Sequence, residues 1–182
     1  MNYYGAKDLA AAFRTVRNNT IKIAEEIPED KYDFRASPET RTVAQTLAHI
    51  ATSTGFSYQM HAVLKLSNFE GFDMRGFFAQ IMADEQKQRS KGEIIQLLRE
   101  GGDQFATFLE GLTDDVLAET VTFPAGSTPP SKLRFEMLLG AKEHEMHHRG
   151  QLMMMERMIG IVPHLTREQQ ARMAAMQAGR AS

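Results

Sequence analysis

The chain has 182 residues and contains neither cysteine nor tryptophan. The lack of cysteine excludes disulfides, thiolate metal ligands and a cysteine nucleophile, and it fits a reducing cytoplasm. Any thiol chemistry therefore needs a thiol from outside the chain. No apolar run approaches the roughly 20 residues that cross a membrane. Residues 1–5 also lack the basic and apolar segments of a signal peptide, so we expect a cytoplasmic protein.

An excess of positive charge is also lacking, because 21 basic residues face 23 acidic ones and the net charge is −2. This balance argues against a nucleic-acid-binding surface. Hydrophobic residues make up 42% of the chain, which is ordinary for a globular protein. At this length we expect one domain over residues 1–182 with its own core.

Apolar residues recur at intervals of three and four positions, which is typical of amphipathic helices. Four long helices are predicted, over about residues 7–27, 42–66, 91–112 and 132–159. A Ser90–Glu93 capping box opens the third helix and Ser131 is expected to cap the fourth. Shorter pieces are expected between and after them: a helix or lid within 67–90, an extended stretch at 119–123 and a helix from Thr166. The predicted fold is all-α, a four-helix bundle with short extra helices.

Three of the six histidines fall between residues 144 and 148. His144 and His148 are four residues apart, so on a helix both lie on one face and can reach one divalent metal. Their face is otherwise apolar, and an unpaired polar ring there costs about 1–3 kcal/mol. His147 points about 60° away from His144 and is expected to matter less. Ordinary helix histidines are the alternative interpretation.

A further histidine, His49, lies on the second predicted helix, on a face that is polar at one end and apolar at the other. Such a face suits the mouth and floor of a pocket. Antiparallel packing would place His49 opposite His144 and His148, and three imidazoles leave a metal position open for chemistry. Gln45 and Gln151 could support the ligands or contact a substrate, although packed or solvated glutamines are the simpler interpretation.

The two histidine motifs, Leu47-Ala48-His49-Ile50 and His144-x-x-x-His148-Arg149-Gly150-Gln151, resemble those of the DinB/YfiT-like helical-bundle metalloproteins. This is the damage-inducible family and not the DNA polymerase of the same name. The resemblance covers nearly the whole chain, except that residues 67–130 carry no matching motif. It implies that His49, His144 and His148 bind zinc, nickel or a similar divalent ion. It also implies a homodimer.

Family members of known activity use a low-molecular-weight thiol, as bacillithiol or glutathione S-transferases or mycothiol-dependent enzymes. The resemblance therefore implies a metal-dependent transferase that acts on a small-molecule substrate with a thiol cosubstrate. The lack of cysteine agrees with a nucleophile brought from outside. Metal-assisted hydrolysis of the substrate stays open, and the sequence assigns no catalytic residue.

Two other functions compete with this one. Residues 144–148 satisfy the H-E-x-x-H pattern of zinc proteases, in which Glu145 would be the general base and His164 or Glu168 a third ligand. In that case Glu145→Gln would abolish activity and keep the metal, whereas in a bundle metalloprotein the change should be mild. The other candidate is a non-enzymatic dimer that binds a metal or small ligand.

Overall fold

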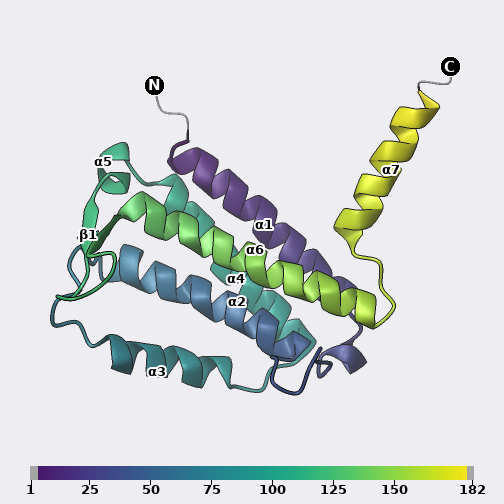
Figure 1. Ribbon diagram of the computed structural model, residues 1–182, viewed down its shortest axis with the longest axis horizontal. Coiled ribbons are helices and arrows are strands. Elements are labelled where there is room, and N and C mark those ends of the chain that lie inside the picture. Colours follow the sequence, from purple (N-terminus) through teal and green to yellow (C-terminus); the bar gives the residue numbers. More distant parts are fainter. Residues whose placement is uncertain (1–3, 180–182) are drawn as a thin grey trace.

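The computed structural model describes residues 4–179, and most of them are helical (Figure 1). The long helices are α1 (Ala6–Glu26), α2 (Val43–Tyr58), α4 (Lys91–Glu110) and α6 (Arg134–Met158). Helices α4 and α6 each pack against both α1 and α2, so α1 and α2 lie diagonally across the bundle. The predicted four-helix bundle is therefore confirmed, and it makes α2 and α6, which carry the three histidines, neighbours.

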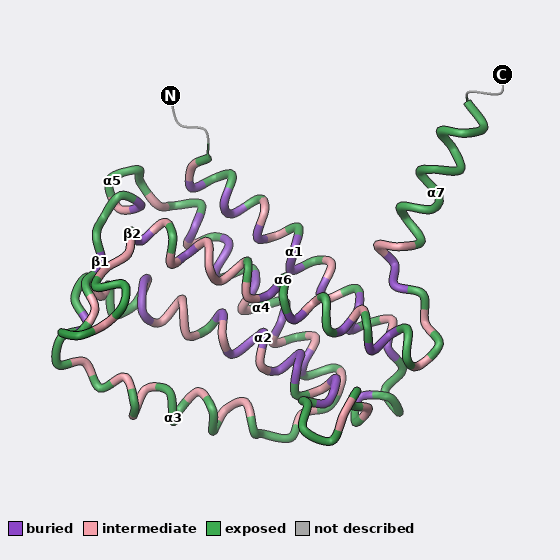
Figure 2. Tube along the Cα trace, viewed as in Figure 1, coloured by how far each residue is buried: buried purple, intermediate pink, exposed green. Residues whose placement is uncertain are grey.

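Shorter elements complete the chain. A turn of 3-10 helix spans Glu29–Lys31 and a π-helical turn, Gln59–Val63, extends α2. Strands β1 (Thr120–Thr122) and β2 (Ser131–Leu133) pair antiparallel. The remaining helices are α3 (Met74–Glu85), α5 (Asp114–Leu117) and α7 (His164–Ala178). Helix α3 runs along the outside of α2, whereas α7 leaves the bundle and is exposed along most of its length (Figures 1 and 2).

Of the three helix caps that the sequence predicts, the structure has one and differs at two. At α4 the capping box is confirmed, because Ser90 Oγ accepts from the backbone of Glu93, whose carboxylate accepts the Ser90 N–H at 2.7 Å. The predicted Ser131 cap is wrong, since Ser131 pairs with β1 and α6 begins at Arg134. Helix α7 begins before Thr166, because the Pro163 carbonyl already accepts from the Thr166 backbone.

The core of the bundle has two apolar halves. One half joins residues near the C-terminal end of α1 to the start of α2, such as Ile23 and Leu47. The other half lies around the N-terminal part of α1 and includes Phe13 and Phe105, whose rings meet edge to face. Between these halves in the sequence of α1 lies Arg17, which is only 3% exposed. A polar layer therefore divides the core.

Arg17 contacts all three of the other long helices. Its Nε and Nη2 donate to the Glu145 carboxylate of α6, at 3.0 and 2.8 Å. Its Nη1 donates to the Leu98 carbonyl of α4, and its Nη2 also donates to Thr54 Oγ1 of α2, both at 2.7 Å. Glu145 is 1% exposed. One guanidinium thus links the four helices, and its charge is matched by a single buried carboxylate.

Two adjacent glycines in α4 provide a test of this close packing. A Cβ at Gly102 would lie 2.7 Å from Arg17 Cγ, whereas a Cβ at Gly101 would meet nothing within 4 Å. We expect Gly102→Ala to lower the free energy of unfolding by about 1–3 kcal/mol through overpacking. We expect Gly101→Ala to raise it by up to about 1 kcal/mol, because alanine is the better helix former. Urea unfolding measures both; equal effects would contradict the close approach.

Candidate metal centre

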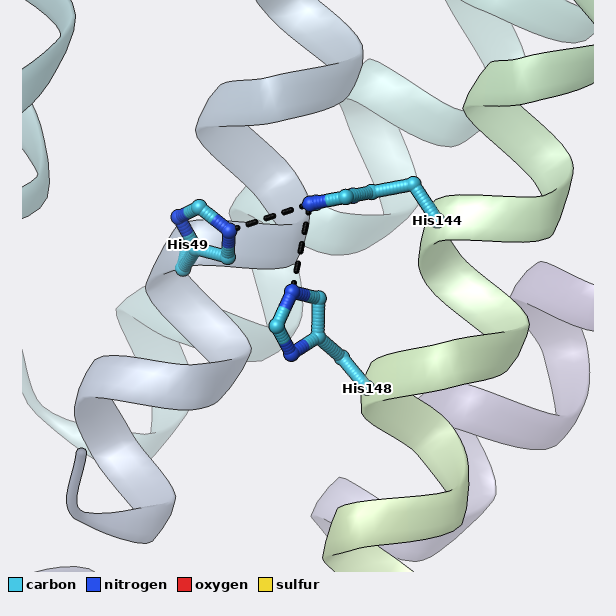
Figure 3. A group of neighbouring side chains, drawn as sticks. All are labelled: His49, His144 and His148. Carbon is cyan, nitrogen blue, oxygen red and sulfur yellow. Dashed lines mark hydrogen bonds between the residues drawn. The ribbon is translucent and has the colours of Figure 1, made fainter. Parts of the chain in front are cut away.

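Helices α2 and α6 bring His49, His144 and His148 together (Figure 3). His144 and His148 project from adjacent turns of α6, and His49 faces them from α2. The Nε2 of His144 lies 3.1 Å from that of His49 and 3.2 Å from that of His148. The three candidate ligand atoms all lie within 4.8 Å of one another. The structure therefore places the three predicted residues in one cluster, across two helices that are nearly 100 residues apart in the chain.

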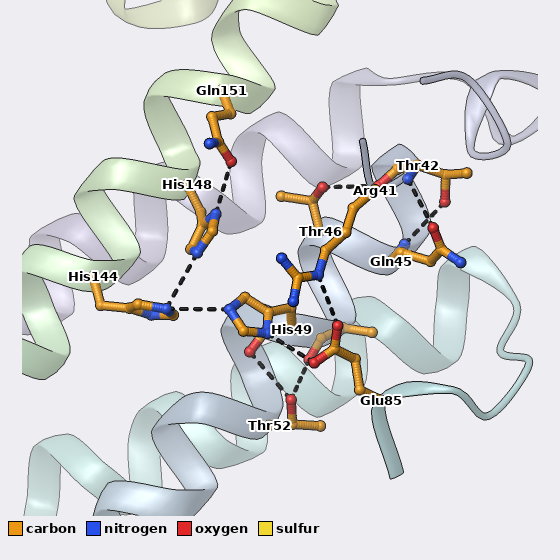
Figure 4. Close-up of polar contacts among 11 residues, drawn as sticks. Arg41, Thr42, Gln45, Thr46, His49, Thr52, Glu85, His144, His148 and Gln151 are labelled. Carbon is orange, nitrogen blue, oxygen red and sulfur yellow. Dashed lines mark hydrogen bonds and ion pairs between the residues drawn. The ribbon is translucent and has the colours of Figure 1, made fainter. Parts of the chain in front are cut away.

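The outer nitrogens of two of the rings are fixed by hydrogen bonds (Figure 4). His49 Nδ1 lies 2.8 Å from Glu85 Oε2 on α3, and His148 Nδ1 lies 2.8 Å from Gln151 Oε1 one turn along α6. Both oxygens accept, so each ring donates its Nδ1–H and keeps a lone pair on Nε2. The lone pairs consequently point to the centre of the cluster. This is how metal-binding histidines are commonly oriented.

The Glu85 carboxylate is held in its turn by Arg41, whose Nε donates to Oε1 at 2.8 Å. Burial would raise the pKa of Glu85, but the hydrogen bonds from His49 and Arg41 outweigh burial and the pKa is lowered. Glu85 is therefore ionised at neutral pH and accepts from both neighbours. The chain of contacts from Arg41 through Glu85 fixes the ring of His49.

The donor set fits a divalent cation. Two Nε2 lone pairs, from His49 and His148, face His144 Nε2, which can offer at most one proton to one of them. Nitrogens on a tetrahedral zinc ion, each about 2.05 Å from the metal, lie about 3.4 Å apart. The separations of 3.1 and 3.2 Å are close to that spacing. A cation at the centre would satisfy all three rings at once.

The protonation states also suit a metal. Burial, and then the nearby rings of His148 and His49, together lower the pKa of His144 to about 4. Burial is also the main cause of the lowered pKa of His148, although its hydrogen bond to Gln151 opposes the shift. These two rings are therefore neutral at pH 7. Neutral imidazole is the form that binds metal ions.

Two pockets open beside the cluster. One, of about 620 Å³, is lined by His49 and His144 together with several phenylalanines and methionines; we call it the aromatic pocket. The other, of about 880 Å³, is lined by His148, Gln151 and the loop before α2; we call it the glutamine pocket. Arg41, Met82 and Glu85 line both. The cluster is thus accessible from two sides.

The structure does not supply the arrangement that a zinc protease of the H-E-x-x-H type needs. Both oxygens of Glu145 accept hydrogen bonds from Arg17 in the core, so this carboxylate is not free to act as a general base. The two conceivable third ligands are engaged elsewhere. His164 Nε2 lies 3.2 Å from Asn19 Oδ1, and Glu168 pairs with Lys22. The residue that lies beside His144 and His148 is His49 instead.

The glutamines and His147 have different roles. Gln45 caps α2, because its side-chain oxygen accepts the Thr42 N–H at 2.9 Å. For Gln151 the simpler interpretation is wrong, since it holds His148 and its Nε2 also lies 3.2 Å from His147 Nε2. His147 is exposed and outside the cluster, as predicted.

Sequence reasoning missed Arg41 and Glu85. Arg41 precedes α2, and Glu85 ends α3, within the segment that carried no motif. Their role depends on α3 lying beside α2, which is a tertiary contact between helices. No spacing within either segment indicates that contact.

Comparisons with known proteins agree with this fold. The model of the DinB superfamily matches residues 12–152. The YjoA protein of Bacillus subtilis is 23% identical over 156 residues, covering 85% of this chain and 91% of that protein. Its crystal structure, described as a DinB-like protein, has a TM-score of 0.61 at 22% identity and covers 84% of this chain and 92% of YjoA.

A second solved structure, YfiT from Bacillus subtilis, has a TM-score of 0.67 at 16% identity, with 88% of this chain and 91% of YfiT covered. YfiT is described as a probable metal-dependent hydrolase with an unusual four-helix bundle topology. At such identities the structural likeness shows the fold alone. The family match, however, spans all of α2 and α4 and both predicted histidine motifs. The chain belongs to the DinB superfamily.

Proposed function

We propose that His49, His144 and His148 bind one divalent metal ion, zinc or nickel, and that the protein is a metal-dependent enzyme that activates a small nucleophile. One observation carries this proposal: three Nε2 atoms converge from two helices while the Nδ1 atoms of His49 and His148 are held by Glu85 and Gln151. In histidine metal sites the ring nitrogen that does not bind the metal commonly donates a hydrogen bond to such a group, which orients the ring. The aromatic pocket and the glutamine pocket, on two sides of the cluster, leave room for reactants.

A divalent ion at such a site supplies a Lewis acid that lowers the pKa of a coordinated water or thiol. Burial keeps the rings of His144 and His148 neutral, and Glu85 and Gln151 hold the rings of His49 and His148 in the orientation that a metal needs. The description of YfiT as a probable metal-dependent hydrolase supports a water nucleophile. The glutamine pocket favours a nucleophile larger than water, because a water molecule needs no pocket of about 880 Å³. We therefore propose a low-molecular-weight thiol as nucleophile, with hydrolysis as the second candidate.

Metal removal tests the function. Protein loaded with zinc or nickel is mixed with an activated aryl halide or an activated ester, with and without glutathione, bacillithiol or mycothiol. We expect product formation that depends on a thiol, falls to the background rate after chelation, and returns when the metal is added back. The readout is the absorbance of the arylated product for the halide and of the released group for the ester.

The other outcomes separate the alternatives. Metal-dependent product without any thiol would replace the transferase with a hydrolase. A protein that keeps one metal ion per chain and turns over none of these compounds would favour the non-enzymatic binder. A protein that takes up no metal would overturn the proposal. The thiol-free reaction of the metal in buffer is the control for background.

Two further expectations stay predictions: the homodimer and the cytoplasmic location. Within residues 4–179 no helix is both long and apolar enough to cross a membrane. The substrate is expected to be a small molecule, since the two pockets beside the cluster have volumes of hundreds of Å³.

A further inference from the structure

The aromatic pocket extends far beyond the histidine cluster. Along α2 and the π-helical turn that follows it, the lining runs from His49 to His61, in the middle of that turn. Twelve residues of helix correspond to about 18 Å, so His61 lies at the end of the pocket distant from the cluster. The wall between the two ends is mainly apolar and includes Phe56, Met60, Phe78 and Met137. This shape suits an elongated, flat and mostly apolar compound.

A hydrogen bond to Arg134 occupies one ring nitrogen of His61, so only the other nitrogen can hydrogen-bond to such a compound. Arg134 Nη1 lies 2.9 Å from His61 Nδ1, and arginine can only donate, so Nδ1 must accept. Arg134 is itself fixed by Glu119, whose Oε2 accepts from Nε and Nη2 at 2.9 and 2.7 Å. A neutral His61 ring therefore carries its proton on Nε2. Burial, and then the charge of Arg134, lower the pKa of His61 to about 4, so the ring is neutral at pH 7.

The Nε2–H of His61 is available to a ligand. The ring is only 5% exposed, and its Nε2 has no hydrogen-bond partner among residues 4–179. Nevertheless, this atom is not among the sealed, unpartnered polar atoms of the described chain. The atom therefore keeps some accessible surface, and the ring that carries it lines the aromatic pocket. Placement in a π-helical turn agrees with a functional role, since such turns are frequent at functional sites.

The charges around the pocket narrow the ligand class. Four charged side chains line it, and each has a partner of opposite sign: Lys132 pairs with Glu136 at 2.9 Å, and Arg41 pairs with Glu85 at 2.8 Å. No unpaired cation in the described lining is left for a carboxylate or phosphate. The free polar group at the distant end is a neutral N–H donor. A neutral oxygen acceptor is its natural partner.

We propose that the aromatic pocket binds the substrate of the metal centre, an elongated small molecule with an aromatic or flat apolar body and a neutral carbonyl-type oxygen that accepts from His61 Nε2–H. This assignment rests on the proposed function for the role of the bound compound as substrate, with its reactive group toward His49 and His144. The binding itself depends only on the pocket and on His61, so it can be tested separately.

Nitrogen-15 NMR of the histidines tests the donor in the wild-type protein, with benzylacetone, a neutral aryl ketone, as the probe. We expect His61 to show a neutral ring with its proton on Nε2, and that proton to move downfield when benzylacetone is added. His164, which is buried and bonded to Asn19 outside the pocket, should not respond. A His61 proton on Nδ1, or a His61 signal indifferent to saturating probe, would overturn the proposal.

Affinity gives a second test, by calorimetry on both metal-free and metal-loaded protein. We expect the metal-free protein to bind benzylacetone at least about 10-fold more tightly than hydrocinnamate, its carboxylate counterpart, because the pocket offers no free cation. We expect His61→Phe to weaken benzylacetone binding about 10-fold, the loss of one hydrogen bond, and His61→Gln, which keeps an N–H donor, to weaken it less. Equal affinities for the two probes would contradict the assignment.

The arms of this experiment separate two kinds of failure. If benzylacetone binds through His61 but the protein holds no metal, the pocket stands and the proposed function falls. If the protein holds metal but benzylacetone binding ignores His61, the function stands and the pocket assignment falls. Because His61→Phe leaves Arg134 without an acceptor, thermal unfolding of that variant is measured first. If it does not fold, the wild-type NMR result decides.

Discussion

Replacing His49 with alanine is expected to lower the affinity of the protein for zinc or nickel by at least about 100-fold. Loss of an indirect partner of a metal ligand typically costs about 10–100-fold, and His49 is proposed as a ligand itself. The effect should equal that of His144→Ala or His148→Ala, because the three Nε2 atoms share one centre. Elemental analysis of protein purified without an affinity tag gives the metal per chain, and competition with a chelating dye gives the affinity.

His147→Ala is the matched control, since His147 neighbours His148 on α6 but lies outside the cluster. We expect it to lower the affinity far less, and only through its contact with Gln151. Full retention of metal in His49→Ala would refute a site that bridges α2 and α6. Loss in His49→Ala together with retention in His147→Ala would exclude a general effect of histidine removal.

The helices and the pair of histidines on α6 could be predicted because their signals are local. Periodic apolar positions gave α1 and α4 nearly to the residue, and the capping box at Ser90 marked the start of α4. His144 and His148 form a pair through spacing alone, since four residues make about one helical turn. His49 was linked to them through the family resemblance and the polar-to-apolar gradient of its face. Ser53, Phe56 and Met60 of that face do line the aromatic pocket.

The supporting residues could not be predicted because their partners are distant in the chain. Glu85 reaches His49 from α3, and Arg134 reaches His61 across 73 residues. Such contacts depend on how the helices pack, and no periodicity within one segment reports them. The same reason explains the error at Ser131, whose strand forms only because β1 lies beside it. Glu145 is a further case, since its partner Arg17 is 128 residues away.

Glu145→Gln is expected to lower the free energy of unfolding by about 3–5 kcal/mol. Removal of one member of a buried ion pair leaves the other charge in the core without its counter-ion, and Arg17 is 3% exposed. The sequence predicted only a mild effect of this change on activity in a bundle metalloprotein, and the buried ion pair adds an expected cost in stability. Urea unfolding of metal-free protein measures the effect. Glu143→Gln, at the exposed position two residues earlier, should change the free energy by less than about 0.5 kcal/mol.

A double variant separates the cost of an unpaired charge from the value of the pair. Replacing Arg17 and Glu145 together with methionine removes both charges, and buried pairs replaced by apolar residues often lose little stability. The other groups that Arg17 contacts stay satisfied, because Thr54 Oγ1 also donates to the Ile50 carbonyl and the Leu98 carbonyl lies within α4. We therefore expect the double variant to be more stable than Glu145→Gln. If Glu145→Gln instead lost activity while keeping full stability and its metal, Glu145 would act as the base of a zinc protease and the buried pair would be refuted.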